Sequence, residues 1–246
     1  MRILVIGESC RDIFHYGECS RLCPAAPVPV FKSVSIEKNG GMAKNVQENL
    51  NSLGVKTDIV TNEGWTTITK TRYVDLNSNH MFLRVDENDD LYGKINLDTS
   101  QKKDFEIYDA IVISDYNKGF LSTHTLQKVS RLHNLVFLDT KKILGEWCNE
   151  FRFIKINNRE YESTKRTLTK NLKEKLIITR GPYGSEHEGE LFPVSSVEVK
   201  DTSGAGDTFL AALVKKYVET KDIKQSIVFA NECATLVVQK RGVSAL

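Results

Sequence analysis

From Asp109 onward, short apolar runs alternate with segments of helical periodicity. Continuous apolar runs are typical of strands that are buried on both faces, as in parallel sheets. The pattern predicts strands at 2–7, 110–114, 135–138, 153–156 and 175–179, and helices at 122–132, from about 159, at 205–219 and at 222–240. Repeated strand-then-helix units build an open sheet with helices on both faces. We therefore predict a doubly wound, mainly parallel α/β domain.

The N-terminal part of the chain carries a second kind of strand. Residues 28–36 are rich in β-branched residues and follow a proline-rich turn, which indicates an exposed strand. Residues 66–74 and 80–86 are β-rich runs joined by a polar loop, as in a hairpin. A helix between Gly41 and Gly54 and a short strand at 57–60 separate them. The exposed strands do not suit the interior of the large sheet, so we predict a separate small β layer.

The bulk composition is that of an ordinary globular protein. A chain of 246 residues with 27% charged residues suits a single domain with a small appendage. The net charge of +2 and the scattered basic residues argue against a nucleic-acid partner. The sequence has no secretory leader and no long apolar run, so we predict a cytoplasmic protein without membrane contact. The five cysteines form no Cys-x-x-Cys pair and are expected to be free thiols.

The richest local signal is the turn from Asp201 to Asp207, which leads into an apolar-periodic helix. Gly204 and Gly206 lack Cβ atoms, so the N–H groups of residues 204–206 can converge on one point. The first N–H groups of a helix have no intrahelical partner and attract anions, phosphate above all. A carboxylate at Asp207 adds a general base beside this anion hole. That combination suits phosphoryl transfer to a hydroxyl.

A structural alternative exists for the same residues. Asp207 could stabilise the helix dipole, with Asp201 or Ser203 as the helix cap. The glycine spacing and the helix that follows favour phosphoryl chemistry. Other glycine loops fit less well. The sequence lacks Gly-x-x-x-x-Gly-Lys-Ser/Thr, which argues against a P-loop, and lacks Gly-x-Gly-x-x-Gly after the first strand, which argues against a dinucleotide fold.

Polar or glycine-rich clusters recur at the carboxyl ends of the predicted strands, where open α/β sheets bind their ligands. These clusters are Glu8 with Asp12, Asn45 in the helix after Gly41, residues 114–119, residues 139–141, Asn157 with Glu160, and residues 179–181. Asn157 and Glu160 have two interpretations, a helix capping box and oxygen ligands near Mg²⁺. Asn231, on an apolar helix stripe, either bonds a neighbour or lines a nucleotide pocket.

These segments are similar to the signatures of the ribokinase-like (PfkB) carbohydrate kinases. Residues 201–207 resemble the C-terminal signature, and residues 40–45, with the helix end at 53–54, resemble the N-terminal one. Within that family, the proline-rich segment 20–30 and the segments 69–72, 83–86, 114–119 and 139–141 most resemble the heptose-7-phosphate kinases. The likeness runs from residue 2 to about 243.

The resemblance implies a fold and a set of roles. It implies one ribokinase-like domain over 1–246, with a β-sheet lid formed by residues 17–38 and 66–87, and no nucleotidyltransferase domain. Asp207 would be the base, and the N–H groups of Gly204, Ala205 and Gly206 would stabilise the moving phosphoryl group. The implied substrate-binding residues are Asp12, Arg21, Gly40, Gly41, Asn45 and Lys118. The implied nucleotide-binding residues are Lys141, Asn157, Thr179, Gly181, Gly184, Gly204, Gly206 and Asn231.

The resemblance also implies ligands and partners. ATP and Mg²⁺ are expected, with Asn157 and Glu160 near the metal through water. A monovalent cation beside the anion hole is common in this family, as is a homodimer formed through the lid. The expected reaction is phosphorylation of a sugar or sugar phosphate, with D-glycero-D-manno-heptose 7-phosphate as the leading substrate. The alternatives are a kinase for another small sugar-like substrate and a degenerate homologue that binds nucleotide without turnover.

The sequence departs from the family pattern on the acceptor side. Only residues 61–64 separate Val60 from Trp65, where the family normally inserts a strand, a helix and another strand. Glu8 replaces an aspartate, and Met42 and Lys44 replace small residues. The reaction type is therefore better specified than the substrate.

Overall fold

The computed structural model describes residues 1–95 and 102–242. Its larger sheet has eight strands in the order β12-β11-β10-β9-β8-β7-β1-β4. The parallel part consists of β4 (Lys56–Val60), β1 (Arg2–Gly7), β7 (Ala110–Asp115), β8 (Val136–Thr140), β9 (Phe153–Asn157) and β10 (Leu176–Thr179). Two antiparallel strands, β11 (Ser185–His187) and β12 (Glu190–Phe192), complete one edge. The predicted doubly wound α/β sheet is confirmed.

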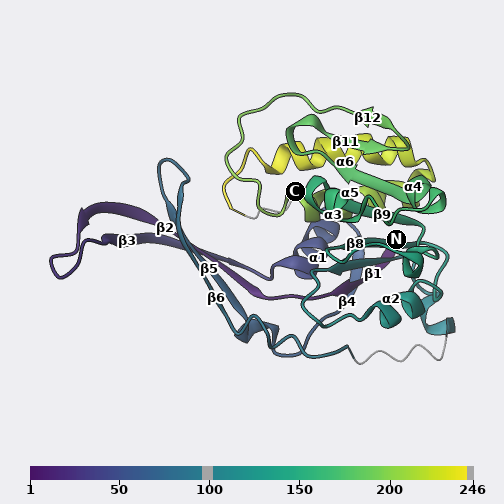
Figure 1. Ribbon diagram of the computed structural model, residues 1–246, viewed down its shortest axis with the longest axis horizontal. Helices are drawn as coiled ribbons and strands as arrows, with labels where there is room; N and C mark the ends of the chain where they lie inside the picture. The colour runs from purple at the N-terminus through teal and green to yellow at the C-terminus, as the bar shows by residue number, and fades with distance from the viewer. Residues whose placement is uncertain (96–101, 243–246) are drawn as a thin grey trace.

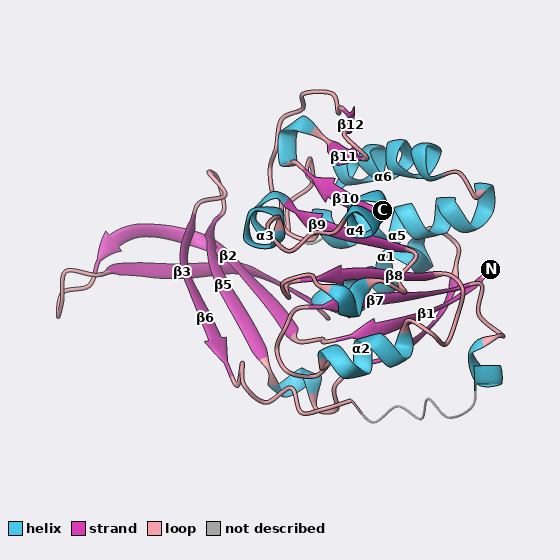
Figure 2. Cartoon of the chain, turned by 45° about the vertical axis from the view of Figure 1, so that its right-hand side comes forward, coloured by secondary structure: helices cyan, strands magenta, loops and turns pink. Residues whose placement is uncertain are grey.

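Helices cover both faces of this sheet (Figure 2). One face packs against α1 (Met42–Ser52), α5 (Ala205–Thr220) and α6 (Ile223–Val237). The other face packs against α2 (Thr123–Val129), α3 (Asn158–Thr164) and α4 (Lys170–Lys175). The buried residues of β7, Ala110–Asp115, contribute alternately to the two cores, which is why that strand reads as a continuous apolar run.

The differences from the predicted elements are local. The edge strands β11 and β12 and the helix α4 are too short to carry a periodic signal, and the prediction missed them. The 122–132 and 222–240 helices end earlier than expected, at Val129 and Val237. Short 3₁₀ turns occupy η1 (Trp65–Thr67), η2 (Lys102–Phe105), η3 (Glu146–Cys148) and η4 (Gly181–Tyr183). The first of these replaces the start of the strand expected at 66–74.

The smaller sheet projects from one side of the domain (Figure 1). It contains β3 (Pro29–Asn39), β2 (Arg11–Leu22), β5 (Thr69–Asp75) and β6 (Met81–Glu87), in that order. We call these four strands the lid. The separate β layer and the β5–β6 hairpin are confirmed. The sequence pattern missed β2, because both faces of its first half mix polar and apolar residues: buried Asp12, Phe14 and Tyr16 alternate with half-buried Arg11, Ile13 and His15. The lid core is small, with Phe14, Tyr16 and Val74 as its buried cluster.

Short crossings join the lid to the domain. The segment between β4 and η1 is hydrogen-bonded to the segment between β1 and β2: Ser9 N–H donates to Asn62 Oδ1 at 2.8 Å, and Thr61 Oγ1 donates to Ser9 Oγ at 2.8 Å. Asn62 Nδ2 returns a bond to the carbonyl of Ser9 at 3.2 Å. These hydrogen bonds join two of the crossings to each other at the base of the lid. At the β5–β6 turn, Asn79 donates to the carbonyl of Lys200, just before the glycine turn.

Candidate active site

The glycine turn begins α5 as the sequence predicts. Gly204 is the N-cap with φ 78°, a left-handed conformation that favours glycine, and α5 starts at Ala205. No side chain of the described residues caps this helix. The alternative in which Asp201 or Ser203 caps it is therefore wrong. Asp201 instead accepts the N–H of Ser203 at 2.8 Å, inside the turn. Residues 204–207 line the cavity described below, and within the turn the N–H of Ala205 donates to the carbonyl of Thr202 at 3.3 Å.

Asp207 lies in the first turn of α5 and is buried. The phenol of Tyr116 donates to its Oδ1 at 2.9 Å, and Nδ2 of Asn45, from α1, donates to its Oδ2 at 3.3 Å. Each carboxylate oxygen thus has one donor from a different element. The N-terminal ends of α1 and α5 meet at this point, which brings the two sequence signatures together. Two donors fix the plane of the carboxylate, as a base that must meet a hydroxyl requires.

The surroundings tune the acidity of Asp207. Burial raises its pKa to about 6, and the nearby Asp139 carboxylate adds to the rise, while Lys155 and the two hydrogen bonds oppose it. The carboxyl is ionised at neutral pH, and its pKa lies close to the operating pH. A general base works best in that range.

Lys155 is the residue that sequence analysis missed. It stands on β9 directly opposite Asp139 on β8, and its Nζ lies 2.7 Å from Asp139 Oδ2. Both side chains are largely removed from water. Burial alone lowers the pKa of Lys155, but the Asp139 carboxylate outweighs it and raises the pKa above its usual value. The ammonium is therefore charged. A Cβ built on Gly206 would lie 3.0 Å from Lys155 Nζ, so this charge sits against the glycine turn.

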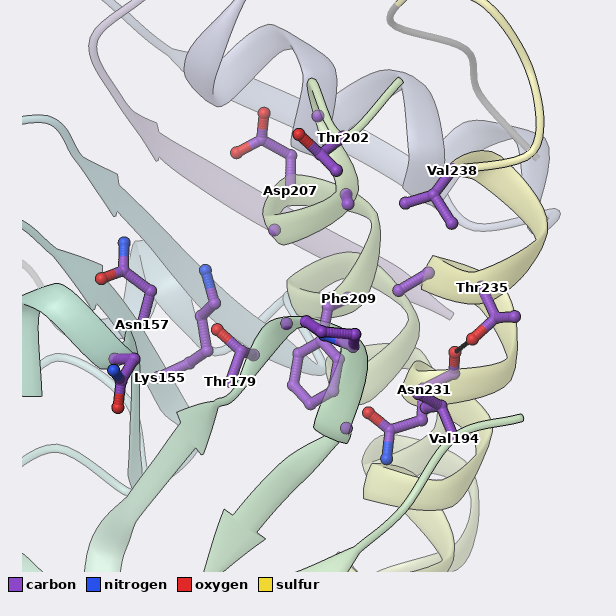
Figure 3. Close-up of a pocket in the computed structure, with 18 of the residues that line it drawn as sticks. Lys155, Asn157, Thr179, Val194, Thr202, Asp207, Phe209, Asn231, Thr235 and Val238 are labelled. Atoms are coloured by element: carbon purple, nitrogen blue, oxygen red, sulfur yellow. Dashed lines mark hydrogen bonds between the residues drawn. The ribbon is translucent and has the colours of Figure 1, made fainter. Parts of the chain in front are cut away.

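A cavity of about 730 Å³ opens beside the turn. Figure 3 shows Lys155, Asn157 and Thr179 on one side and Asn231, Thr235 and Val238 on the other, with Asp207 at the start of α5. The predicted nucleotide-binding residues that line it are Lys141, Asn157, Thr179, Gly181, Gly184, Gly204, Gly206 and Asn231. Apolar side chains, including Val194, Val199 and Phe209, form the rest of the wall. A polar end beside an apolar end is typical of pockets for small organic ligands.

Asn157 and Glu160 form the capping box that was one of their two interpretations. Asn157 Oδ1 accepts the N–H of Glu160 at 2.9 Å, and Glu160 Oε2 accepts the N–H of Asn157 at 2.7 Å. The second carboxylate oxygen, Oε1, faces Lys141 Nζ at 3.6 Å. Within residues 1–95 and 102–242, no cluster of three or more His, Cys, Asp or Glu could hold a metal ion. A divalent cation here would depend on phosphate and water oxygens for most of its ligands.

Two residues of the cavity wall, Asn231 and Gly184, also stabilise the local structure. Asn231 accepts from Ser185 Oγ at 3.1 Å and donates to the Phe192 carbonyl at 2.8 Å, so it ties both edge strands to α6. A Cβ on Gly184 would lie 2.1 Å from that same carbonyl, so only glycine fits there. The hydrogen-bonding interpretation of Asn231 is therefore correct. Its position in the cavity wall is compatible with the second interpretation as well.

The opposite side of Asp207 faces the lid. Asp12, on β2, accepts from Arg72 Nη1, on β5, at 2.9 Å, and both side chains are largely buried. Gly41 has φ 54°, and a Cβ there would lie 2.9 Å from Cys10 Sγ. Gly40 precedes it at the start of α1, where a Cβ would collide with Lys44. Asp12, Gly40, Gly41 and Asn45 are thus gathered at the junction of lid and domain.

Lys118 belongs to a charged network at the base of the lid. Asp89 accepts from Lys118 and from Lys70 on β5, and the phenol of Tyr92 donates to it at 2.9 Å. Burial opposes ionisation of Asp89, but these three hydrogen bonds outweigh it and lower its pKa to about 2. Glu8 accepts the backbone N–H groups of Tyr116 and Lys118 at 2.9 and 3.1 Å. Lys118 is therefore held on the lid side of Asp207, away from the cavity.

Arg21 is not brought to this site. It is exposed, pairs with Val30 across the β2–β3 hairpin, and lies toward the end of the lid that projects away from the domain (Figure 1). The other predicted substrate-binding residues lie at the lid base.

The chain is similar in sequence to a family of known proteins. The model of the pfkB family carbohydrate kinases matches residues 38–246. Proteins named bifunctional protein HldE are 32% identical over 98% of the chain in Helicobacter pylori strain J99 and 28% identical over 100% of it in Psychromonas ingrahamii. The chain spans only 63% and 62% of their lengths. Both alignments cover 295 positions, more than the chain contains.

Solved structures agree on the fold. A Thermotoga maritima ribokinase has a TM-score of 0.69 and 18% identity, covering 98% of this chain and 94% of its own. An Arabidopsis thaliana ribokinase, solved with ribose and ATP, has a TM-score of 0.69 and 17% identity, covering 98% of this chain and 93% of its own. No helix within the described residues is long and apolar enough to span a membrane.

Proposed function

Because the chain belongs to the pfkB family of carbohydrate kinases, we propose that it transfers the terminal phosphoryl group of ATP to a hydroxyl of a sugar phosphate. The leading substrate is D-glycero-D-manno-heptose 7-phosphate, with the 1,7-bisphosphate as product. The alternative is a kinase for another small sugar-like acceptor.

One observation carries the reaction type. Asp207 is a buried carboxylate with a pKa of about 6, held by Tyr116 and Asn45 in the first turn of a helix that has no side-chain cap. A carboxylate in that place can take the proton of an attacking hydroxyl. The neighbouring N–H groups of Gly204 and Gly206 would stabilise charge on the phosphoryl group during transfer. The N–H of Ala205 would join them on leaving the carbonyl of Thr202, to which it donates here. Phosphoryl transfer demands little of a protein beyond such positioning and charge stabilisation.

The nucleotide would occupy the cavity beside the turn. Its apolar wall suits a base and its polar end suits phosphates. Lys141 and the start of α3, where Asn157 lies, border the polar end. Glu160 Oε1, which faces Lys141, would also accept a hydrogen bond from a water in the hydration shell of Mg²⁺, a cation that retains several waters when bound. The metal would neutralise part of the triphosphate charge.

The acceptor would bind on the lid side of Asp207. The Asp12–Arg72 pair offers carboxylate and guanidinium groups to sugar hydroxyls, close to Gly41 and Asn45. Lys118, now paired with Asp89, would meet the phosphate that the acceptor already carries. Closure of the lid would exclude water as a competing acceptor.

The identity of the sugar rests on resemblance. The segments 20–30, 69–72 and 114–119 resemble the heptose-7-phosphate kinases, and relatives named HldE align over nearly the whole chain. A second copy would cover the exposed apolar side chains of the lid, among them Val34, Ile36 and Leu83, and so form a homodimer. Arg21 would then contact substrate only after the lid closes or a second lid approaches.

An acceptor panel tests the proposal. The purified chain would be incubated with ATP, Mg²⁺ and heptose 7-phosphate, fructose 6-phosphate or ribose, and ADP and the phosphorylated product would be measured. Turnover with heptose 7-phosphate alone supports the leading substrate, and turnover with another acceptor selects the alternative. Nucleotide binding without turnover on any acceptor would contradict the reaction. Asp207→Asn is the matched inactive control.

A further inference from the structure

We propose that Lys155 is a phosphoryl-binding residue of this kinase, held by Asp139 against the glycine turn until the terminal phosphoryl group of the nucleotide arrives. The inference rests on the proposed nucleotide-binding function and adds a cation to it. It concerns a side chain on a central strand that no sequence signature marked. The ligand it would take is the end of a nucleoside triphosphate.

The position of Lys155 is unusual for its strand. Its neighbours Ile154 and Ile156 point into the opposite core, and Phe153 packs below it on the same face. Lys155 and Asn157 share that face and both line the cavity, as Figure 3 shows. The strand therefore changes from apolar to polar at the level of Asp139, the second-last residue of β8. A long charged side chain at that point reaches the turn rather than solvent.

Charge gives the reason for a cation there. The carboxylates of Asp139 and Asp207 both lie at the polar end of the cavity. A triphosphate that approaches two carboxylates in a buried site would be repelled. The ammonium of Lys155 is 2.7 Å from Asp139 and next to Gly206, so it lies between the Asp139 carboxylate and the glycine turn. Its charge also lowers the pKa of Asp207. It offsets the charge of both carboxylates at the place where the phosphoryl group must stand.

A purely structural ion pair is the competing explanation. Burying a charged pair gains little stability over apolar residues of similar size, so stability alone explains the Lys155–Asp139 pair poorly. A second pair, Lys142 with Asp115, lies one strand end away, with Nζ 2.7 Å from Oδ1. Lys142 is also poorly exposed but does not line the cavity. It provides a matched control for loss of a buried pair.

The proposed action involves no covalent step. On nucleotide binding, the Lys155 ammonium would donate one of its three hydrogens to a terminal phosphoryl oxygen and keep another on Asp139. The contact would strengthen as charge shifts toward that group during transfer. Asp139 is then a positioning residue, because it acts only by aiming Lys155.

Binding of two nucleotides separates this role from a structural one. Calorimetry would compare ADP with the non-hydrolysable triphosphate AMP-PNP, each with Mg²⁺, for the full chain and for Lys155→Met/Asp139→Asn, which removes both charges together. We expect AMP-PNP affinity to fall about 10- to 100-fold, as for loss of a charge-assisted hydrogen bond, and ADP affinity to change less than about threefold. Lys155→Arg should recover part of the AMP-PNP affinity.

The outcomes are distinct. Equal losses for both nucleotides, or unchanged AMP-PNP affinity in a folded double variant, would overturn the role of Lys155. Lys142→Met/Asp115→Asn, which likewise removes both charges of a buried pair, should lower thermal stability without changing the ratio of the two affinities. A changed ratio would show a general effect of losing a buried pair and would overturn the assignment. If the unaltered chain binds neither nucleotide, the proposed function itself fails. Circular dichroism would confirm that each variant is folded.

Discussion

The two sides of Asp207 are built differently. On the nucleotide side, the cavity is walled by elements of one packed domain whose strands are buried on both faces. On the acceptor side, the lid has a buried cluster of only three residues, and β6 is exposed along its whole length. The nucleotide side is therefore formed before any ligand arrives. In the proposed reaction, the acceptor side would be completed only when the lid closes over it.

The two sides are therefore suited to different steps of the proposed reaction, nucleotide binding and enclosure of the acceptor. A preformed pocket loses little conformational entropy when it binds, so it can hold ATP tightly at all times. A mobile lid can close only when the acceptor supplies enough contacts, which keeps water away from ATP until then. Changes on one side should leave the ligand of the other side nearly unaffected.

The largest expected effect is at Asp207, which lies between the nucleotide side and the acceptor side. Asp207→Asn keeps the shape of the side chain but removes the base, so we expect turnover to fall about 10²- to 10⁴-fold. ADP affinity should stay within about threefold, because the amide lies at the edge of the nucleotide cavity. Steady-state kinetics and calorimetry would check both numbers. Near-normal turnover would break the assignment of the base.

A change on the lid side should act on the acceptor alone. Arg72→Gln removes the partner of Asp12, and we expect KM for the acceptor to rise about 10- to 100-fold, the range for a charge-assisted hydrogen bond. KM for ATP should be unchanged. Arg84→Gln is the control, because Arg84 is opposite Arg72 on β6 but pairs with the partly exposed Asp86. Equal effects of the two variants would contradict a specific role for Arg72.

The phenol of Tyr116 connects the base to the β7 side of the site. Its hydrogen bond lowers the pKa of Asp207, so Tyr116→Phe should move the acidic limb of the kcat/KM profile from about pH 6 to higher pH. We expect kcat at pH 7.5 to fall about tenfold, from loss of one hydrogen bond to a charged group. Tyr217→Phe, which removes a buried phenol bonded to Arg152 instead, should leave the profile in place. A profile that does not move in Tyr116→Phe would argue against this contact.

The smallest effect concerns stability. The pKa of Asp207 is about 6 in the folded chain and near 3.8 when unfolded, so ionisation favours the unfolded state as pH rises through that interval. Asp207→Asn should therefore be more stable than the unaltered chain at pH 7.5, by on the order of 1–2 kcal/mol. The difference should vanish as pH falls toward 4. Thermal unfolding at several pH values would measure it, and a variant less stable at pH 7.5 would contradict the burial argument.

The sequence predicted the elements that have strong periodicity. The continuous apolar strands and long helices are in place, and the glycine turn opens α5 as expected. What it could not predict depends on pairing between distant segments. Asp12 meets Arg72 only because β2 and β5 lie side by side in parallel, and no local pattern encodes that register. Tyr116 lies within the segment 114–119, but its contact with Asp207 forms only in the folded sheet.

Lys155 could have been found. A lysine inside a strand predicted to be buried on both faces is an exception that needs an explanation. Its spacing of two residues from Asn157 places both on one face of the strand. The cluster at Asp139 follows the preceding predicted strand of the chain. Those three facts were in the sequence, and only the cross-strand register was missing.

The crossing at Thr61 and Asn62 has a thermodynamic consequence. A long insertion at this point would have to be ordered each time a substrate is enclosed, and the lost chain freedom would weaken binding. Here the crossing is short, and its hydrogen bonds to Ser9 hold it in one conformation before any ligand is present. The acceptor wall at the hinge is thus ordered when the chain folds rather than at every turnover. Binding enthalpy would then be opposed by a smaller entropic penalty.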